Sequence, residues 1–221
     1  MQNLWNSVNL KNRFLNKTSI YFMFFILFYG IQGIISIFNK RFAPPMDIFA
    51  ATSIITLFFV LHLFIRFRVI VPIFIGLGFI PHIFGLYSIF GEGKTLYGLA
   101  LLNYHYDWIV HSVGIFCYSF AFCSITYPYF KRGFKSKPLI FVLLLFFMLG
   151  LGAFNEVLEY VGFDVFGYGE GFLEFGDGDS SPNSGPWQNS SMDLISNLVG
   201  GIIGIGSFLL IKKQRENLIP S

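Results

Sequence analysis

Apolar residues follow one another along this chain in six long runs, which shorter polar segments separate. Each run holds about the 20 residues that an α-helix needs to cross the hydrocarbon core of a bilayer. The third run contains Pro72, Pro81 and several glycines, which favour a kinked helix. The pattern predicts an all-α fold, a polytopic membrane helix bundle. Its six transmembrane helices are expected at about residues 19–38, 47–65, 69–90, 106–127, 138–161 and 192–211.

The connections between these runs differ in length and character. The segment Gly91–His105 has an apolar middle at Leu96–Leu102, which favours a partial helix in the membrane interface. The longest connection, residues 162–191, is polar and rich in Gly, Ser, Asp and Pro. The chain is therefore expected to divide into an N-terminal segment (1–18), a membrane domain (19–211) with a long outer loop (162–191), and a tail (212–221).

The basic residues give the expected orientation. If the N-terminus lies inside, only Lys40, Arg41 and Lys94 of the 15 Lys and Arg residues lie outside. Cytoplasmic connections carry an excess of Lys and Arg, so both termini are predicted to be cytoplasmic. We expect a multi-pass protein of a bacterial plasma (inner) membrane.

Composition supports this class and excludes others. The chain has 221 residues, of which 54% are hydrophobic and only 12% charged, whereas soluble domains carry roughly 25% charged residues. A net charge of +3 is too small to indicate a nucleic-acid partner. Cys117 and Cys123 fall in one apolar run, so we expect buried thiols rather than a disulfide. His62 stands alone in its run and is expected to be a packed histidine.

Polar residues recur in pairs near the expected outer ends of the last three helices. Members of a pair three or four positions apart share one helix face. The fourth and sixth helices begin outside and the fifth ends outside, so the three pairs are expected at one depth. The pairs are Asp107 with His111, Glu156 with Glu159, and Asp193 with Asn197, and the supporting polar or aromatic residues are His82, His105, Asn155 and Trp187.

This set of side chains is typical of a cation site. Carboxylates with imidazole suit Zn, Mn or Fe, and carboxylates with water suit Mg or Ca. Clustered carboxylates in a medium of low dielectric constant can also share a proton. The candidate catalytic residues and metal ligands are Asp107, His111, Glu156 and Glu159, with Asp193 as a further ligand. On the outer side of the membrane, such a site could reach lipids and precursors of the cell envelope.

Other interpretations remain open from the sequence alone. Asp107 and Asp193 each precede an apolar run and could cap a helix N-terminus, and Glu159 could reach the membrane interface. The Glu156–His111 pair could simply hold helices together, and small residues such as Gly114, Gly150, Gly152 and Gly200 could pack helices closely.

A carrier of solutes or protons is a further alternative. It would require polar residues in the inner halves of the last three helices, where the sequence offers little beyond Ser119, Ser124, Thr126 and Ser207. The sequence does not decide between an enzyme and a protein without catalytic activity, and it leaves the oligomeric state open.

Three sequence blocks occur in an order that resembles a known family. They are Tyr106-Asp107-x-x-x-His111-x-x-Gly114, Ala153-Phe154-x-Glu156-x-x-Glu159, and Pro186-Trp187 leading to Asp193. In this order they resemble the YjdF-like family of bacterial inner-membrane proteins, over roughly residues 70–211. The resemblance implies a small six-span protein with motif positions at Asp107, His111, Glu156, Glu159, Trp187 and Asp193.

A fainter likeness is to VanZ-like membrane proteins. It depends on an Asp-x-x-x-His helix, a later Glu, and the block from Asp193 through Asn197 to Gly200. Neither family implies a defined reaction.

Overall fold

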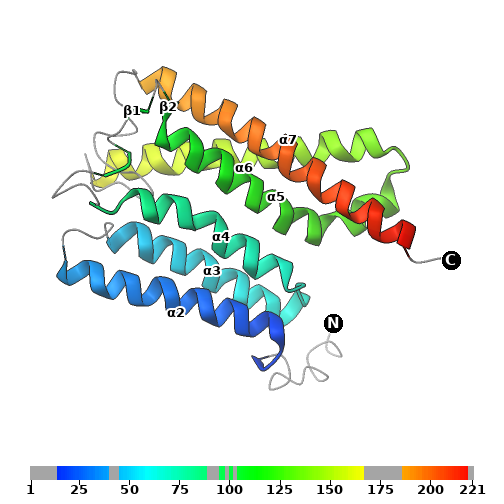
Figure 1. The fold of residues 1–221 in the computed structure, drawn as a ribbon, viewed down its shortest axis with the longest axis horizontal. Helices are drawn as coiled ribbons and strands as arrows, with labels where there is room; N and C mark the ends of the chain where they lie inside the picture. Colours follow the sequence, from blue (N-terminus) through cyan, green and yellow to red (C-terminus); the bar gives the residue numbers. More distant parts are fainter. Residues whose placement is uncertain are drawn as a thin grey trace.

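The structure, a computed structural model, describes residues 14–39, 45–88, 95–97, 100–101, 104–166 and 186–218. These residues form six helices and one two-stranded antiparallel hairpin (Figure 1). The helices are α2 (Lys17–Phe38), α3 (Pro45–Ile65), α4 (Ile70–Gly85), α5 (Tyr106–Gly133), α6 (Lys137–Phe166) and α7 (Pro186–Leu218). The hairpin consists of β1 (Ala100–Leu101) and β2 (Tyr104–His105).

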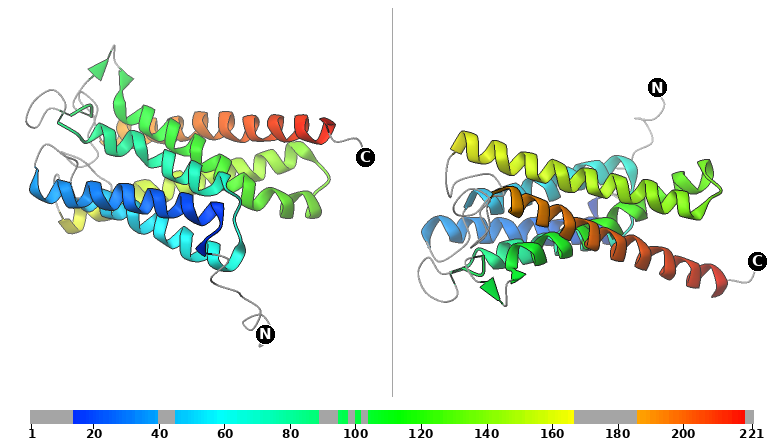
Figure 2. Two further views of the ribbon diagram at one scale, coloured as in Figure 1. Left: turned by 60° about the horizontal axis from the view of Figure 1, so that its bottom comes forward. Right: turned by 90° about the horizontal axis from the view of Figure 1, so that it is seen from above.

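The six helices lie lengthwise beside one another as two groups of three (Figures 1 and 2). Helices α2, α3 and α4 pack around one core, which includes Phe22, Tyr29 and Ile55. Helices α5, α6 and α7 pack around a second core, which includes Leu144, Met148 and Ile205. Helix α5 joins the two groups, because it packs extensively against both α4 and α7.

The outer surface of the bundle is apolar, as a lipid-facing surface must be. Five helices are long and apolar enough to cross a membrane, and α4, with 16 residues, is the shorter apolar helix. Large side chains point outward, among them Phe38, Leu27 and Phe146, which are 84%, 62% and 69% exposed. Soluble monomers rarely expose so many large apolar side chains. The predicted class, a helical membrane protein, is confirmed.

Four helix ends lie beyond the apolar runs that predicted them. Helix α5 continues from the predicted end near residue 127 to Gly133, and α6 continues from about 161 to Phe166. Helix α7 begins at Pro186 rather than near 192, and it ends at Leu218 rather than near 211. Hydropathy detects only the part of a helix that is apolar, whereas these added turns are polar or mixed. Both ends of the expected loop 162–191 are therefore helical.

The connection from α4 to α5 departs most from expectation. Helix α4 ends at Gly85 rather than near residue 90, because the chain turns there and the backbone N–H of Leu96 donates to the carbonyl of Gly85. A partial helix was expected between Gly91 and His105. The described residues of that segment instead include the hairpin, in which Ala100 pairs with His105. Residues 95–97 are described and are not helical, and the remaining residues of the segment lie outside the described residues.

Glycines allow α7 to approach α5 closely. A Cβ atom at Gly200 would lie 2.2 Å from the carbonyl oxygen of Ser112, and one at Gly204 would lie 2.8 Å from that of Phe116. Small residues four apart are a recurrent means of close packing between membrane helices. Gly152 is likewise in close contact, with Asn197, but a Cβ at Gly150 would meet nothing within 4 Å. The expected packing role therefore holds for Gly200 and Gly152 and is wrong for Gly150.

Two predictions about single side chains are confirmed. Cys117 and Cys123 are buried free thiols. His62 is buried, its Nδ1 accepts from the backbone N–H of Phe67 at 2.8 Å, and its Nε2 lies 3.3 Å from the side-chain amide of Asn16. This histidine therefore fixes the turn that follows α3 to the start of α2.

Candidate functional site

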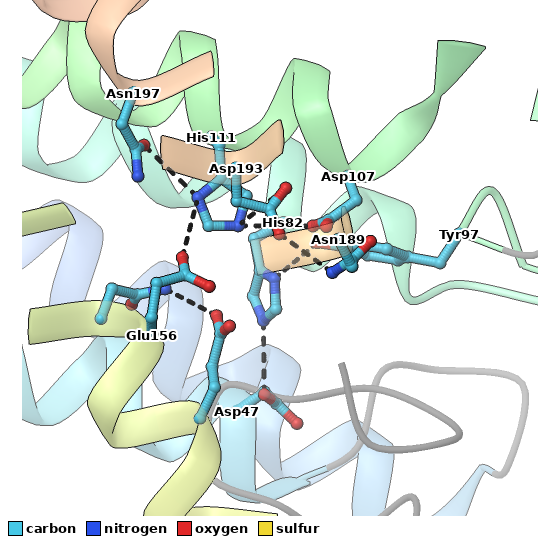
Figure 3. Close-up of polar contacts among 11 residues, drawn as sticks. Asp47, His82, Tyr97, Asp107, His111, Glu156, Asn189, Asp193 and Asn197 are labelled. Carbon is cyan, nitrogen blue, oxygen red and sulfur yellow. Dashed lines mark hydrogen bonds and ion pairs between the residues drawn. The ribbon is translucent and has the colours of Figure 1, made fainter. Parts of the chain in front are cut away.

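The polar pairs of the last three helices meet at one end of the bundle, where α5 and α7 begin and α6 ends (Figures 1 and 3). Helix α5 contributes Asp107 and His111, and α7 contributes Asp193 and Asn197. Helix α6 contributes the third pair, Glu156 and Glu159. The described Lys and Arg residues belong to the start of α2, the turn from α3 to α4, the connection from α5 to α6 and the end of α7, and these segments lie at the opposite end of the bundle (Figure 1).

His111 is the centre of this cluster. Its side chain is 8% exposed, and both ring nitrogens face polar groups (Figure 3). Nδ1 lies 3.3 Å from Oδ1 of Asn197 and 3.7 Å from Oε1 of Glu156. Nε2 lies 3.5 Å from Oδ1 of Asp107 and 3.9 Å from Oδ1 of Asp193. Four side chains from three helices therefore surround one imidazole.

The tautomer of His111 decides what its Nε2 can do. With the proton on Nδ1, the ring would donate to Oδ1 of Asn197, and the lone pair of Nε2 would point toward the carboxylates of Asp107 and Asp193. With the proton on Nε2, the ring would instead donate to one of these carboxylates. In the first tautomer three electron-pair donors face one another, and a cation, either a proton or a metal ion, would stabilise this arrangement.

The distances from Nε2 of His111 to the carboxylate oxygens of Asp107 and Asp193 suit ligands of a shared metal ion better than they suit hydrogen bonds. Hydrogen bonds between nitrogen and oxygen are usually about 2.7–3.2 Å long. Tetrahedral ligands at about 2.0–2.2 Å from Zn²⁺ lie about 3.3–3.6 Å apart. The Nε2–Asp107 distance of 3.5 Å falls in this second range, and the Nε2–Asp193 distance of 3.9 Å exceeds it slightly. One ligand atom from each of these three residues lies within 4.8 Å of the other two.

A second possible ligand set shares the same histidine. His111, Glu156 and Glu159 also offer three ligand atoms within 4.8 Å of one another. Glu159 is 7% exposed, and its Oε1 accepts from the side-chain amide of Asn155 at 2.6 Å. This set is the weaker one, because Nδ1 already has Asn197 as its partner and Glu159 is held by Asn155. Glu159 is thus buried in the bundle rather than directed outward.

Asn189 supports the first ligand set from one turn earlier in α7. Its side-chain amide donates to Oδ2 of Asp193 at 2.9 Å, which leaves Oδ1 directed at His111 (Figure 3). Both side chains are buried.

The two aspartates lie inside their helices. Asp193 is seven residues after the first residue of α7, and Asp107 follows the N-cap residue His105 of α5. Neither aspartate is an N-cap, so that alternative interpretation is wrong.

A second polar cluster faces the same space from α3 and α4. Nε2 of His82 lies 3.3 Å from Oδ1 of Asp47, and its Nδ1 lies 2.7 Å from the hydroxyl of Tyr97. A carboxylate only accepts, so Nε2 carries the proton and Nδ1 accepts from the phenol. Burial, with the negative charges of Asp107 and Glu159 nearby, raises the pKa of Tyr97 well above its usual value, so the phenol keeps its proton.

Tyr97→Phe is expected to reduce the free energy of unfolding by about 1–2 kcal/mol, because Nδ1 of His82 would lose its donor inside the protein. Thermal unfolding of the purified protein in detergent would measure this loss. Tyr160→Phe is the matched control, since Tyr160 is 65% exposed. Equal effects of the two substitutions would contradict the assignment of this hydrogen bond.

A cavity of about 520 Å³ connects the two polar clusters and continues into the bundle. His82, Tyr97, Asp107, His111 and Glu159 line its polar end. The remainder is mainly apolar, and its lining includes Ile54, Phe58, Ile75, Phe122, Ile125 and Leu158. The cavity therefore combines one acidic, histidine-containing end with a long apolar part.

Two of the supporting residues lie apart from the cluster. His105 is buried, and the centre of its ring lies 4.7 Å from the centre of the Trp108 ring, whereas Trp187 is 86% exposed.

Three residues of the site were not predicted: Asp47, Tyr97 and Asn189. Asp47 could have been suspected, because it stands at the outer end of its expected helix. Asn189 lay in the expected loop, and nothing in the sequence marked Tyr97.

The comparisons with known proteins show a family. No curated protein and no solved structure matches the chain. One family matches over residues 19–214, a region that contains His111, the other residues of both polar clusters and the cavity. Since this match covers most of the 221 residues, the chain belongs to the family described as "Predicted membrane protein (DUF2238)".

Proposed function

We propose that this protein binds a divalent cation at His111, Asp107 and Asp193 and uses it on a lipid or an envelope-linked substrate. In this proposal the chain spans a bacterial plasma membrane six times, both termini are cytoplasmic, and the site faces outward. We also propose that the chain is a member of the YjdF-like family, which its sequence resembles. The beginning of α2 and the end of α7 lie at the same end of the bundle, which supports placing both termini on one side of the membrane (Figure 1).

One observation carries the proposal: Nε2 of His111 converges with two carboxylates at the polar end of an apolar cavity. Asn197 would orient the imidazole from its other nitrogen, and Asn189 would orient Asp193. Such outer partners usually fix the ligands of a metal site. A divalent ion bound there would polarise an ester or phosphoryl oxygen and activate a water molecule.

The shape of the cavity supports an amphiphilic substrate. A lipid has a polar headgroup and a long apolar chain, and the cavity has a polar end and an apolar continuation in the same order. Helices α3 and α6 both line the cavity, and neither is packed extensively against the other. A chain could therefore pass between them from the bilayer without crossing water.

The apolar continuation argues against a carrier of ions or small polar solutes. Beyond the polar end, α5 lines the cavity with Ala121, Phe122 and Ile125. Among the inner polar residues, Thr126 uses its hydroxyl to donate to the carbonyl of Phe122 in its own helix. The lining of the cavity is therefore mainly apolar beyond His111.

The test is a search for turnover by metal-loaded protein in lipid nanodiscs. Zn²⁺-loaded, Mn²⁺-loaded and chelator-treated samples would be incubated with phospholipids and isoprenoid phosphates, and products would be detected by mass spectrometry. We expect a product only with metal. Ile54→Trp, which places a larger side chain in the cavity, is expected to reduce turnover at least tenfold while the metal is retained.

Ile34→Trp is the matched control, because Ile34 is 57% exposed on α2 and lies outside the cavity. Turnover that survives Ile54→Trp would show that the substrate does not use the cavity. Absence of product from any lipid, in protein that holds metal, would contradict the lipid part of the proposal.

A further inference from the structure

A second, smaller cavity lies at the opposite end of the bundle from His111. It has a volume of about 170 Å³ and is formed where the turn from α3 to α4 meets the end of α5. Three arginines line it: Arg66 and Arg68 from the turn, and Arg132 from α5. Segments more than 60 positions apart in the sequence therefore contribute arginines to the wall of one cavity.

These arginines have no carboxylate partner within the described residues. Ser124 and Tyr129 of α5 add hydroxyl groups to the lining, while Ile125 and Phe67 form apolar parts of its wall. Guanidinium groups match phosphate oxygens with paired hydrogen bonds. The chemistry of the cavity is thus that of a phosphate site beside an apolar surface.

The backbone at Arg66 has a conformation that is uncommon for residues other than glycine. Arg66 has φ 61°, in the left-handed region, directly after the last residue of α3. Glycine is the residue that ends helices most readily in this conformation, because a Cβ atom is crowded there. Strained backbone of this kind tends to occur at binding sites. The turn is also held firmly, since the backbone N–H of Phe67 donates to His62 at 2.8 Å.

We propose that Arg66, Arg68 and Arg132 bind the phosphate of an anionic glycerophospholipid at this end of the bundle. The neighbouring helices are apolar on their outer sides, with Phe64 and Ile65 each 53% exposed, so acyl chains can lie against them. In the proposed orientation this end faces the cytoplasmic leaflet, which is rich in anionic lipids. The proposal does not depend on a metal at His111.

The experiment uses the full chain in detergent micelles and native mass spectrometry. Binding of dioleoyl-phosphatidylglycerol would be compared with binding of dioleoyl-phosphatidylcholine. The parent is expected to retain one phosphatidylglycerol molecule preferentially. Arg132→Gln and Arg66→Gly should each weaken that binding about fivefold, and the double variant about 25-fold, since one basic residue near a membrane contributes about that factor.

Lys135→Gln is the matched control, because Lys135 is an exposed cation at the same end but does not line the cavity. It should change the affinity less than twofold. Equal losses for Lys135→Gln and Arg132→Gln would show only a general attraction to positive charge and would overturn the proposal. Displacement of the lipid by a tenfold excess of inorganic phosphate would also overturn it, because the pocket would then serve a soluble phosphate.

Arg66→Gly also separates binding from folding. Glycine adopts φ 61° without strain, so the melting temperature of this variant should equal or exceed that of the parent while lipid affinity falls. If Arg66→Gly proved unstable, Arg66→Asn would replace it, because asparagine tolerates the left-handed region. Unchanged lipid binding in a folded variant at this position would contradict the assignment.

Discussion

Asp193→Asn is expected to weaken the binding of Zn²⁺ or Mn²⁺ by more than 100-fold, whereas the parent should hold about one equivalent. Asp193 would be a direct ligand, and loss of even an outer partner of a metal site commonly costs about 10–100-fold in affinity. His111→Ala, alone or with Glu156→Ala, should remove binding altogether, because His111 belongs to both possible ligand sets. Plasma mass spectrometry after dialysis, with chelator competition, would measure these changes.

Glu159→Gln is the matched control, since it also changes a buried carboxylate into an amide. We expect less than a threefold effect, because Glu159 is held by Asn155 and does not belong to the ligand set of His111, Asp107 and Asp193. The reverse result, with binding lost in Glu159→Gln and kept in Asp193→Asn, would assign the metal to the second ligand set, His111, Glu156 and Glu159. No metal in the parent after loading would favour a shared proton or a purely structural cluster.

Gly200→Ala is expected to reduce the free energy of unfolding by about 2–3 kcal/mol. The new methyl group would lie 2.2 Å from the carbonyl oxygen of Ser112, so the backbones of α5 and α7 would have to separate. The same separation would move Asp193 and Asn197 away from His111, so metal affinity should fall as well. Thermal unfolding and metal titration of the same preparation would measure both effects.

Gly206→Ala provides the comparison within the same helix. A Cβ at Gly206 meets nothing within 4 Å, and alanine favours helix more than glycine does. This variant should be as stable as the parent or slightly more stable. A similar loss of stability in both variants would indicate that helix propensity or the lipid environment, rather than contact between α5 and α7, determines the effect.

The central part of the site could be predicted because helix periodicity and topology are both visible in a sequence. Asp107 and His111 are four apart, as are Asp193 and Asn197, so each pair had to share a helix face. The directions of successive membrane helices alternate, which brought these pairs to one end. In the structure, side-chain oxygens of Asp107, Glu156, Asp193 and Asn197 all lie 3.3–3.9 Å from a ring nitrogen of His111.

The other half of the site could not be predicted, for identifiable reasons. Tyr97 reaches His82 only because α4 stops at Gly85 and the chain folds back, and hydropathy does not show where such a turn falls. Asn189 was assigned to a loop because the first turn of α7 is polar. Asp47 pairs with a residue 35 positions away, and such a pairing depends on packing between helices rather than on local pattern.

The shortness of α4 has a consequence for the membrane around the protein. Sixteen residues of helix are about 24 Å long, roughly 6 Å less than the hydrocarbon thickness of a typical bilayer. In the proposed six-span arrangement, lipids beside α4 must thin locally to match it. Headgroups there would lie closer to the level of His82, at the outer end of this helix. Bilayer thickness would then influence how readily a lipid headgroup reaches the polar end of the cavity.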